Sequence, residues 1–222
     1  MARSTFAQLL VAQLRDLGVE RIYGVVGDSL NPVVDAVRTT EGIEWVHVRN
    51  EEAGAFAAGA EARVTGKLAV CAGSCGPGNT HLVNGLYDAH RSGAPVLALA
   101  SHIPSSQIGQ GYFQETHPDR VFTDCSDYCE LVSTAEQAPR VVHAAIRHAV
   151  QNSAVSVVSL PGDVADLKVA ADAPRLAPVR RGVTVPTVTA VEELAEELNR
   201  AERVALFCGE GVRGANRGAS NL

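Results

Sequence analysis

The sequence predicts an α/β fold: a doubly wound parallel sheet with helices on both faces, followed by a linker and an incomplete second α/β unit. Three observations support this prediction. Strand-like and helix-like segments alternate along the first 165 residues. The central strands are almost continuously apolar, as strands covered on both faces are. After residue 165 the composition changes, and three prolines interrupt a stretch without periodicity.

The first domain, residues 1–165, is expected to contain six strands and five helices. The expected strands are 21–26, 43–49, 67–72, 95–100, 128–133 and 155–160. The expected helices are 4–17, 29–38, 51–65, 136–152 and one that runs from the turn at 76–79 to residue 91. Ser4 and Ser29 are the expected N-caps of the first two helices, and Gly18 ends the first.

The remaining residues are expected to form a linker, 166–189, and the start of a second domain, 190–222. A helix over Val191 to Arg200 and a strand over Arg203 to Cys208 are predicted there. The strand leads into residues 209–214, Gly-Glu-Gly-Val-Arg-Gly, which match the letters of the dinucleotide-binding fingerprint. Only eight residues follow it, so the second strand and distant acid that the fingerprint requires are absent, and we expect no nucleotide site.

Charge and composition exclude several classes of function. The net charge of −6 disfavours non-specific binding to nucleic acid and provides no basic patch for a membrane surface. No apolar run is long enough to cross a bilayer, and the first residues do not resemble a signal peptide. We therefore expect a cytoplasmic protein without a membrane segment.

The five cysteines are Cys71, Cys75, Cys125, Cys129 and Cys208. An odd number of cysteines on apolar strands and turns indicates reduced thiols that behave as small buried hydrophobes. The spacing within each of the first two pairs leaves a zinc site as an alternative. No pair of histidines has ligand spacing, so no metal site is predicted.

Glu51 is the main candidate for chemistry. It follows an apolar strand and precedes a helix of unusually small residues. In parallel sheets, ligands bind at the carboxyl ends of the strands, and this position suits a buried hydrogen-bond acceptor. The alternative is an acid that only stabilises the positive end of the helix dipole. Glu52 is the more natural residue for that role, since one of the two must face inward.

Two further segments also follow strands and are expected at the same edge. Residues 76–79, Gly-Pro-Gly-Asn, form a tight turn that allows a ligand or another backbone to approach closely, although an ordinary strand-to-helix turn has the same composition. Residues 101–124 form a long polar segment rich in glycine, glutamine and aromatic residues, and long irregular loops are often functional.

These motifs resemble a known family, the thiamine-diphosphate enzymes. Residues 49–52 with 57–60 are similar to the segment around the family's catalytic glutamate, and residues 73–79 are similar to its Gly-Pro-Gly-Asn turn. Three further stretches, 103–106, 111–118 and 160–164, resemble the pyruvate oxidase and pyruvate:quinone dehydrogenase branch. The resemblance implies that residues 1–165 are the pyrimidine-binding domain and that the second domain is the truncated start of a central, FAD-type domain.

The resemblance also implies roles for particular residues. Glu51 would hold N1′ of the aminopyrimidine, promoting the imino form that takes the proton from C2 of the thiazolium, and so would be catalytic. Gly78 and Asn79 would approach the pyrimidine, and Phe113 and Gln114 would line the substrate side. The implied function is oxidative decarboxylation of pyruvate to acetate, with quinone or oxygen as acceptor. The implied cofactor is thiamine diphosphate, with FAD and Mg²⁺ in full-length relatives.

Two departures from the family's pattern matter. Asn50 stands where many relatives have histidine. The segment that binds Mg²⁺ and diphosphate is not matched, since residues 162–164 and 27–29 are only its nearest counterparts. We therefore expect a truncated chain that is inactive alone. It is expected to form a homodimer or tetramer, or to pair with a full-length relative.

Two alternatives remain for the function. One is a non-catalytic module that pairs with a full-length relative. The other is a fragment of a carboligase that resembles acetolactate synthase, against which the segment from Gly111 to Pro118 argues.

Overall fold

The computed structural model describes residues 4–170, 177–212 and 215. The chain divides into two compact units, residues 1–181 and 182–222.

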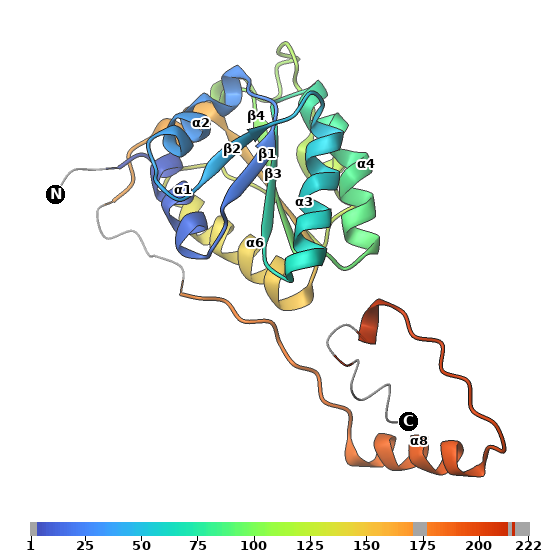
Figure 1. The fold of residues 1–222 in the computed structure, drawn as a ribbon. Coiled ribbons are helices and arrows are strands. Elements are labelled where there is room, and N and C mark those ends of the chain that lie inside the picture. The colour runs from blue at the N-terminus through green and yellow to red at the C-terminus, as the bar shows by residue number, and fades with distance from the viewer. Residues whose placement is uncertain (1–3, 171–176, 213–214, 216–222) are drawn as a thin grey trace. The chain divides into compact units, whose positions relative to one another are not determined.

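The first unit is built on a parallel sheet of six strands in the order β2-β1-β3-β4-β6-β5 (Figure 1). The strands are β1 (Arg21–Gly24), β2 (Glu44–His47), β3 (Ala69–Gly73), β4 (Val96–His102), β5 (Tyr128–Leu131) and β6 (Val155–Pro161). The helices are α1 (Phe6–Asp16), α2 (Asn31–Arg38), α3 (Glu51–Thr65), α4 (Pro77–Arg91), α5 (Pro118–Val121), α6 (Ala138–Asn152) and α7 (Gly162–Asp166). The predicted α/β fold with a wound parallel sheet is confirmed.

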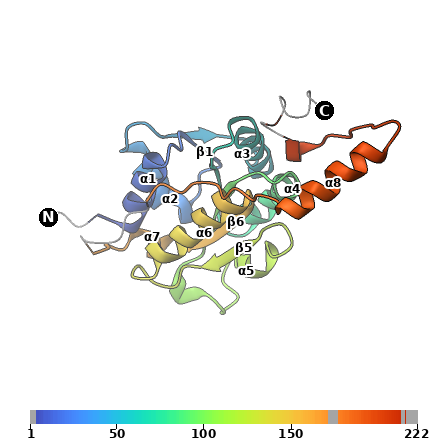
Figure 2. The ribbon, with the colours of Figure 1, turned by 90° about the horizontal axis from the view of Figure 1, so that it is seen from below.

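Helices cover both faces of the sheet. One core lies between the sheet and α1, α2, α6 and α7, and the other lies between the sheet and α3 and α4. Residues of β4 alternate between the two cores: Leu97 and Leu99 enter the first, whereas Val96, Ala98 and Ala100 enter the second. This alternation follows from the period of two along a strand and explains why the central strands are apolar throughout. Figure 2 shows α5 beside β5, with which it is in contact.

The first two helices begin differently from the prediction. Thr5, not Ser4, caps α1: its hydroxyl accepts a hydrogen bond from Gln8 N at 3.2 Å, and the Gln8 side chain accepts one from Thr5 N at 3.0 Å. This reciprocal pair is a capping box, which satisfies two otherwise unpaired donors and so defines the start. Ser29 does not cap α2 but lies in a 3₁₀ turn, Asp28–Leu30, where its side chain bonds to another loop.

Helices α3 and α4 lie side by side and pack unusually closely (Figure 1). A Cβ atom on Gly85 of α4 would lie 2.6 Å from the Cβ of Ala55 and 2.7 Å from the backbone nitrogen of Phe56. Glycine is therefore required at this crossing. The small residues of α3 serve the contact with α4, which fixes the first turns of the two helices relative to each other.

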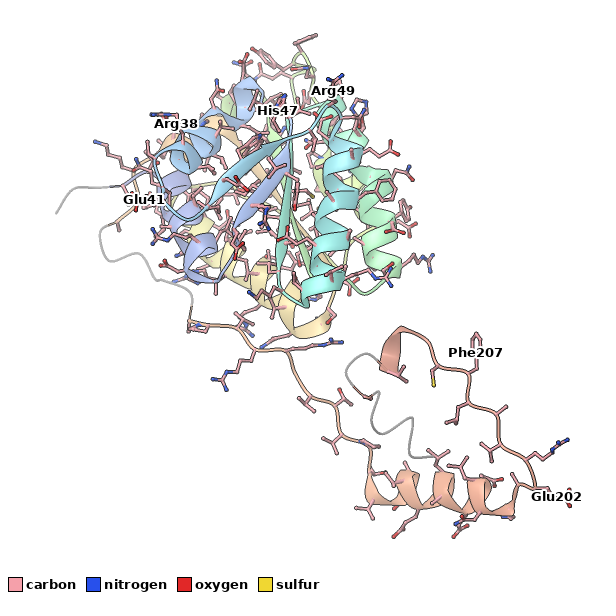
Figure 3. The ribbon with its side chains drawn as sticks, viewed as in Figure 1. Arg38, Glu41, His47, Arg49, Glu202 and Phe207 are labelled. Carbon is pink, nitrogen blue, oxygen red and sulfur yellow. The ribbon has the colours of Figure 1, made fainter. Side chains whose placement is uncertain are left out.

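The second unit contains α8 (Val188–Arg200), which Thr187 caps by accepting a hydrogen bond from Ala190 N at 3.2 Å. The helix predicted over Val191 to Arg200 is confirmed. The strand predicted over Arg203 to Cys208 is wrong, because these residues pair with no other segment that the structure describes, and a strand requires a partner. The Phe207 side chain, labelled in Figure 3, is fully exposed.

The glycine-rich fingerprint begins at Gly209, directly before a 3₁₀ turn, Glu210–Val212, while Arg213 and Gly214 lie outside the described residues. Residues 167 and 169 remain attached to the first unit, since Phe6 N donates to Leu167 O at 2.9 Å and Val169 N donates to Ser4 O at 3.1 Å. In the described parts of the chain, no helix has the length and apolar character needed to cross a membrane.

Candidate functional site

The loops that follow β1, β2, β3 and β4 meet at the carboxyl edge of the sheet. The chain passes from β1 to β2 on one side and then returns to β3 on the other side of β1, so the direction of winding changes between β1 and β3. Ligands of doubly wound folds bind in the crevice that forms at such a point. Figure 3 labels His47 and Arg49 at the end of β2, immediately before α3.

A cleft of about 400 Å³ occupies this edge, and we call it the Glu51 cleft. Every loop predicted to reach the edge contributes to it. Its lining residues are Val26, Gly27, Asp28, Ser29, Glu51, Ser74, Cys75, Pro77, Gly78, His81 and Gln114.

Glu51 is buried at the first position of α3, with only 8% of its surface exposed. Asn50 sets this arrangement, because its side chain caps the helix by accepting a hydrogen bond from Glu52 N at 2.8 Å. Glu52 points elsewhere, and its carboxylate accepts a hydrogen bond from Asn84 Nδ2 at 2.8 Å. The two glutamates are thus separated as expected, with Glu51 facing inward. Asn50, the departure from the family's pattern, is an exposed N-cap.

His81 contacts the Glu51 carboxylate, with 3.0 Å between Nδ1 and Oε2. Sequence reasoning missed this partner because the seven histidines are scattered without metal-ligand spacing. The spacing of His81 from Gly78 along the helix could have identified it. His81 follows Gly78 by three residues in α4, so the two share a face of the helix and reach the same cleft.

Gly78 lies directly against the carboxylate, since a Cβ atom there would be 2.9 Å from Glu51 Oε1. Any larger residue would displace the acid. The structure does not bring Asn79 to the cleft. Asn79 is completely buried, and its Nδ2 donates to the backbone oxygen of Ser101 at 2.7 Å, which ties α4 to β4 behind the cleft wall.

Ser29 joins two loops and the end of a strand at the base of the site. Its hydroxyl lies 3.0 Å from the hydroxyl of Ser74 and accepts a hydrogen bond from Cys75 N at 3.1 Å. Its backbone oxygen accepts a hydrogen bond from the Ser101 hydroxyl at 2.6 Å. These bonds link the loops after β1 and β3 to the end of β4. Sequence reasoning missed them because the partners lie more than forty residues apart in the chain.

A loop of residues 105–117, which we call the aromatic loop, forms the opposite wall. Gln114 has a left-handed backbone (φ 63°) and lines the Glu51 cleft, where Gly76 allows its close approach. Gln114 also lines a second cavity of about 450 Å³, together with Phe113, whose side chain is 80% exposed. Phe113 therefore lies at the second cavity and not among the residues of the Glu51 cleft.

The site contains an acceptor for a heterocycle but no ligand set for a metal. The buried Glu51 carboxylate lines the cleft and fits the aminopyrimidine half of thiamine diphosphate as an acceptor for a ring N–H. Asp163, the nearest counterpart of the family's Mg²⁺-binding acid, accepts a hydrogen bond from Ser105 N at 2.9 Å and holds the aromatic loop. Within the described ranges, no three His, Cys, Asp or Glu residues are grouped as metal ligands.

The cysteines are free thiols, and most are buried. Burial raises the pKa of Cys71 to about 12, that of Cys125 to about 11 and that of Cys129 to about 12. These thiols stay protonated at neutral pH, as small buried hydrophobes do.

The fold and the site together define a doubly wound domain with a buried carboxylate at the switch point of its sheet. Residues 4–121 match the family described as thiamine pyrophosphate enzyme, N-terminal TPP binding domain. The chain belongs to this family.

Several curated proteins are similar over nearly the whole chain. An uncharacterised 42.6 kDa protein of Pseudomonas amyloderamosa is 55% identical over 97% of this chain and 55% of its own length. Pyruvate oxidase of Lactiplantibacillus plantarum is 36% identical over 96% of this chain and 36% of its own length. The acetolactate synthase isozyme 2 large subunit of Escherichia coli is 34% identical over 93% of this chain and 37% of its own length. The chain thus spans about a third to a half of these relatives.

Proposed function

We propose that this chain is the amino-terminal part of a thiamine-diphosphate enzyme that oxidatively decarboxylates pyruvate to acetate. The observation that carries the proposal is the buried Glu51 carboxylate in a cleft at the switch point of the sheet. The family match over residues 4–121 supports the cofactor. The similarity to pyruvate oxidase, together with the segment 111–118 at the end of the aromatic loop and the first residue of α5, supports the substrate.

Glu51 acts as the hydrogen-bond acceptor for the aminopyrimidine. Its Oε2 is held by His81, its Oε1 lies against Gly78, and the carboxylate lines the Glu51 cleft. A carboxylate removed from water interacts more strongly with a ring N–H than an exposed one does. When bound, thiamine diphosphate supplies the carbon nucleophile and the electron sink for decarboxylation.

Gln114 and Phe113 are proposed to bound the substrate side. Gln114 lines both cavities and so lies where the Glu51 cleft meets the second cavity. Asn79 is proposed to act from behind the wall, through its bond to Ser101, and not by contact with the cofactor. FAD, Mg²⁺ and the residues for diphosphate are proposed to come from other parts of a longer protein and from a second subunit of a homo-oligomer.

A carboligase resembling acetolactate synthase is the second candidate, because the E. coli enzyme is similar over nearly the same share of this chain. The two candidates differ in the step after decarboxylation: oxidation by an electron acceptor, or addition to a second 2-oxo acid.

The test is a chimera in which this chain replaces the corresponding part of the L. plantarum pyruvate oxidase. With pyruvate, thiamine diphosphate, Mg²⁺ and FAD, we expect pyruvate consumption coupled to reduction of oxygen or a quinone. The matched control is the same chimera with Glu51→Gln, which is expected to be inactive. Acetolactate formed without consumption of an electron acceptor would contradict the proposal and favour the second candidate.

A further inference from the structure

The aromatic loop contains three residues with left-handed backbones. Gly109 and Gly111 have left-handed backbones, with φ of 86° and 67°, and Gln114 has φ of 63°. For a residue with a side chain this conformation is uncommon and persists only where the surroundings impose it. The three residues turn the loop so that Tyr112, Phe113 and Gln114 come to line the two cavities.

The carboxylate of Glu115 supports this backbone from inside the loop. Its Oε1 accepts a hydrogen bond from Gly109 N at 2.5 Å, and its Oε2 accepts one from Tyr112 N at 3.0 Å. The backbone nitrogen of Glu115 in turn donates to Tyr112 O at 2.9 Å. Successive N–H groups in left-handed turns form a concave site for an anion, and here the anion is a side chain of the loop itself.

The ionisation of Glu115 agrees with this geometry. The backbone N–H groups of Gly109, Tyr112 and Gly111, with a smaller contribution from His117, hold its pKa below the usual range. The acid is therefore charged at neutral pH, and hydrogen bonds to a charged acceptor are stronger than those to a neutral one.

A second acid anchors the start of the loop. Asp163, which follows β6, accepts hydrogen bonds from both the backbone nitrogen and the hydroxyl of Ser105. Asp163 joins the loop to the sheet, whereas Glu115 determines the shape of the loop beyond that anchor. The two acids act on different segments, which makes their effects separable.

We propose that Glu115 is a positioning residue that holds residues 109–112 and thereby places Phe113 and Gln114 at the two cavities. The consequence for pyruvate rests on the proposed function, but the effect on the loop does not.

Hydrogen exchange of backbone amides in this chain tests the effect on the loop. In Glu115→Ala, we expect the amides of Gly109 and Tyr112 to exchange about tenfold faster or more, since both lose a charged acceptor. Glu115→Gln keeps one acceptor oxygen and is expected to be intermediate. Glu136→Gln changes an exposed acid outside the loop and is expected to leave both rates unchanged.

The amides of β4 report the global fold and are expected to exchange as in the unmodified chain. Unchanged exchange at Gly109 and Tyr112 in Glu115→Ala would overturn the proposal. Acceleration spread equally over β4 and the loop would overturn it too, because the role would then be general stability.

The chimera tests the consequence for the substrate. Glu115→Ala is expected to raise the KM for pyruvate about tenfold while the affinity for thiamine diphosphate stays constant, and Glu115→Gln is expected to restore part of the loss. An unchanged KM with a loosened loop would overturn the positioning role. A chimera without any activity on pyruvate would contradict the proposed function alone, since the exchange experiment is independent of it.

Discussion

The two walls of the Glu51 cleft are built by different means. One wall is the start of α3 and α4, where glycines let two helices pack closely and an N-cap turns Glu51 inward. The other wall is the aromatic loop, which two carboxylates hold through bonds to the backbone. Packing fixes the first wall and charge fixes the second. The two walls are therefore expected to respond to different perturbations. Substitutions that disturb helix packing should have the largest effects, and changes that only let the aromatic loop open locally should have the smallest.

The largest effect on stability is expected from Gly85→Ala. The added Cβ would lie 2.6 Å from the Cβ of Ala55, so α3 and α4 must move apart. Overpacking of this kind costs about 1–3 kcal/mol and outweighs the better helix propensity of alanine. Urea unfolding measures the loss. The control is Gly59→Ala, where the Cβ would meet the Cβ of Ala89 at 3.2 Å and a small shift suffices. Equal losses would contradict the account of the close crossing.

Asn79→Ala distinguishes two roles for Asn79: a structural hydrogen bond between α4 and β4, or a contact with the cofactor. The change removes the bond from Nδ2 to the backbone oxygen of Ser101, at a cost of about 0.5–1.5 kcal/mol in the free energy of unfolding. Asn84→Ala removes an exposed amide of the same helix and is expected to stay within about 0.5 kcal/mol. Unchanged stability in Asn79→Ala, combined with weaker binding of thiamine diphosphate, would instead support the role that the resemblance assigned.

Lowering the pH is expected to reduce the free energy of unfolding through His102, a buried residue at the end of β4. Its Nδ1 accepts a hydrogen bond from Ile103 N at 2.9 Å, and burial lowers its pKa, although Glu115 and Asp119 partly oppose this. In the unfolded chain, His102 is protonated as the pH falls through about 6.5. In the folded chain, it is protonated only at a lower pH. Stability from this group is therefore complete above about pH 6.5 and lost as pH falls below it.

The measurement is urea unfolding at about pH 7.5 and about pH 5. Burial lowers the pKa of His143 as well, so the unmodified chain should weaken in acid for both reasons. In His102→Gln we expect a smaller loss between the two pH values, whereas His47→Gln, an exposed control, should behave as the unmodified chain does. An identical pH dependence in all three proteins would exclude the contribution of His102.

The smallest effect is expected in thiol labelling, which reports local opening of the loop. The Cys75 side chain is buried beneath the aromatic loop, with its Sγ 3.7 Å from Gln114 Oε1. Cys208 is exposed and should react with iodoacetamide at the rate of an ordinary thiol. Cys75 should react slowly in the unmodified chain and several-fold faster in Glu115→Ala. Rapid labelling of Cys75 in the unmodified chain would show that the loop does not form a closed wall.

The sequence was informative where structure follows from local pattern. The alternation of strands and helices predicted the parallel sheet, because each buried strand and amphipathic helix has its own period. The inward orientation of Glu51 was predictable for a similar reason. Two adjacent acids at the start of a helix cannot both face the core, and Asn50 supplies the cap that fixes the register.

The sequence was uninformative where partners are distant or where backbone geometry depends on tertiary contacts. His81 meets Glu51 only because α3 and α4 cross at Gly85, and Ser29 serves as a junction of loops rather than as a helix cap. The shape of the aromatic loop depends on a carboxylate bonding back to N–H groups, which no periodicity reveals. The failed strand at 203–208 shows that apolar character alone does not form a strand without a partner.

The most direct test of the central claim is deuterium exchange at C2 of thiamine diphosphate bound to the chimera. Glu51→Gln is expected to slow the exchange by about 100-fold or more, because the acceptor that activates the aminopyrimidine loses its charge. Glu52→Gln, which changes the neighbouring acid that bonds to Asn84, is expected to leave the rate nearly unchanged. Equal slowing in both variants, or normal exchange in Glu51→Gln, would contradict the assignment of Glu51.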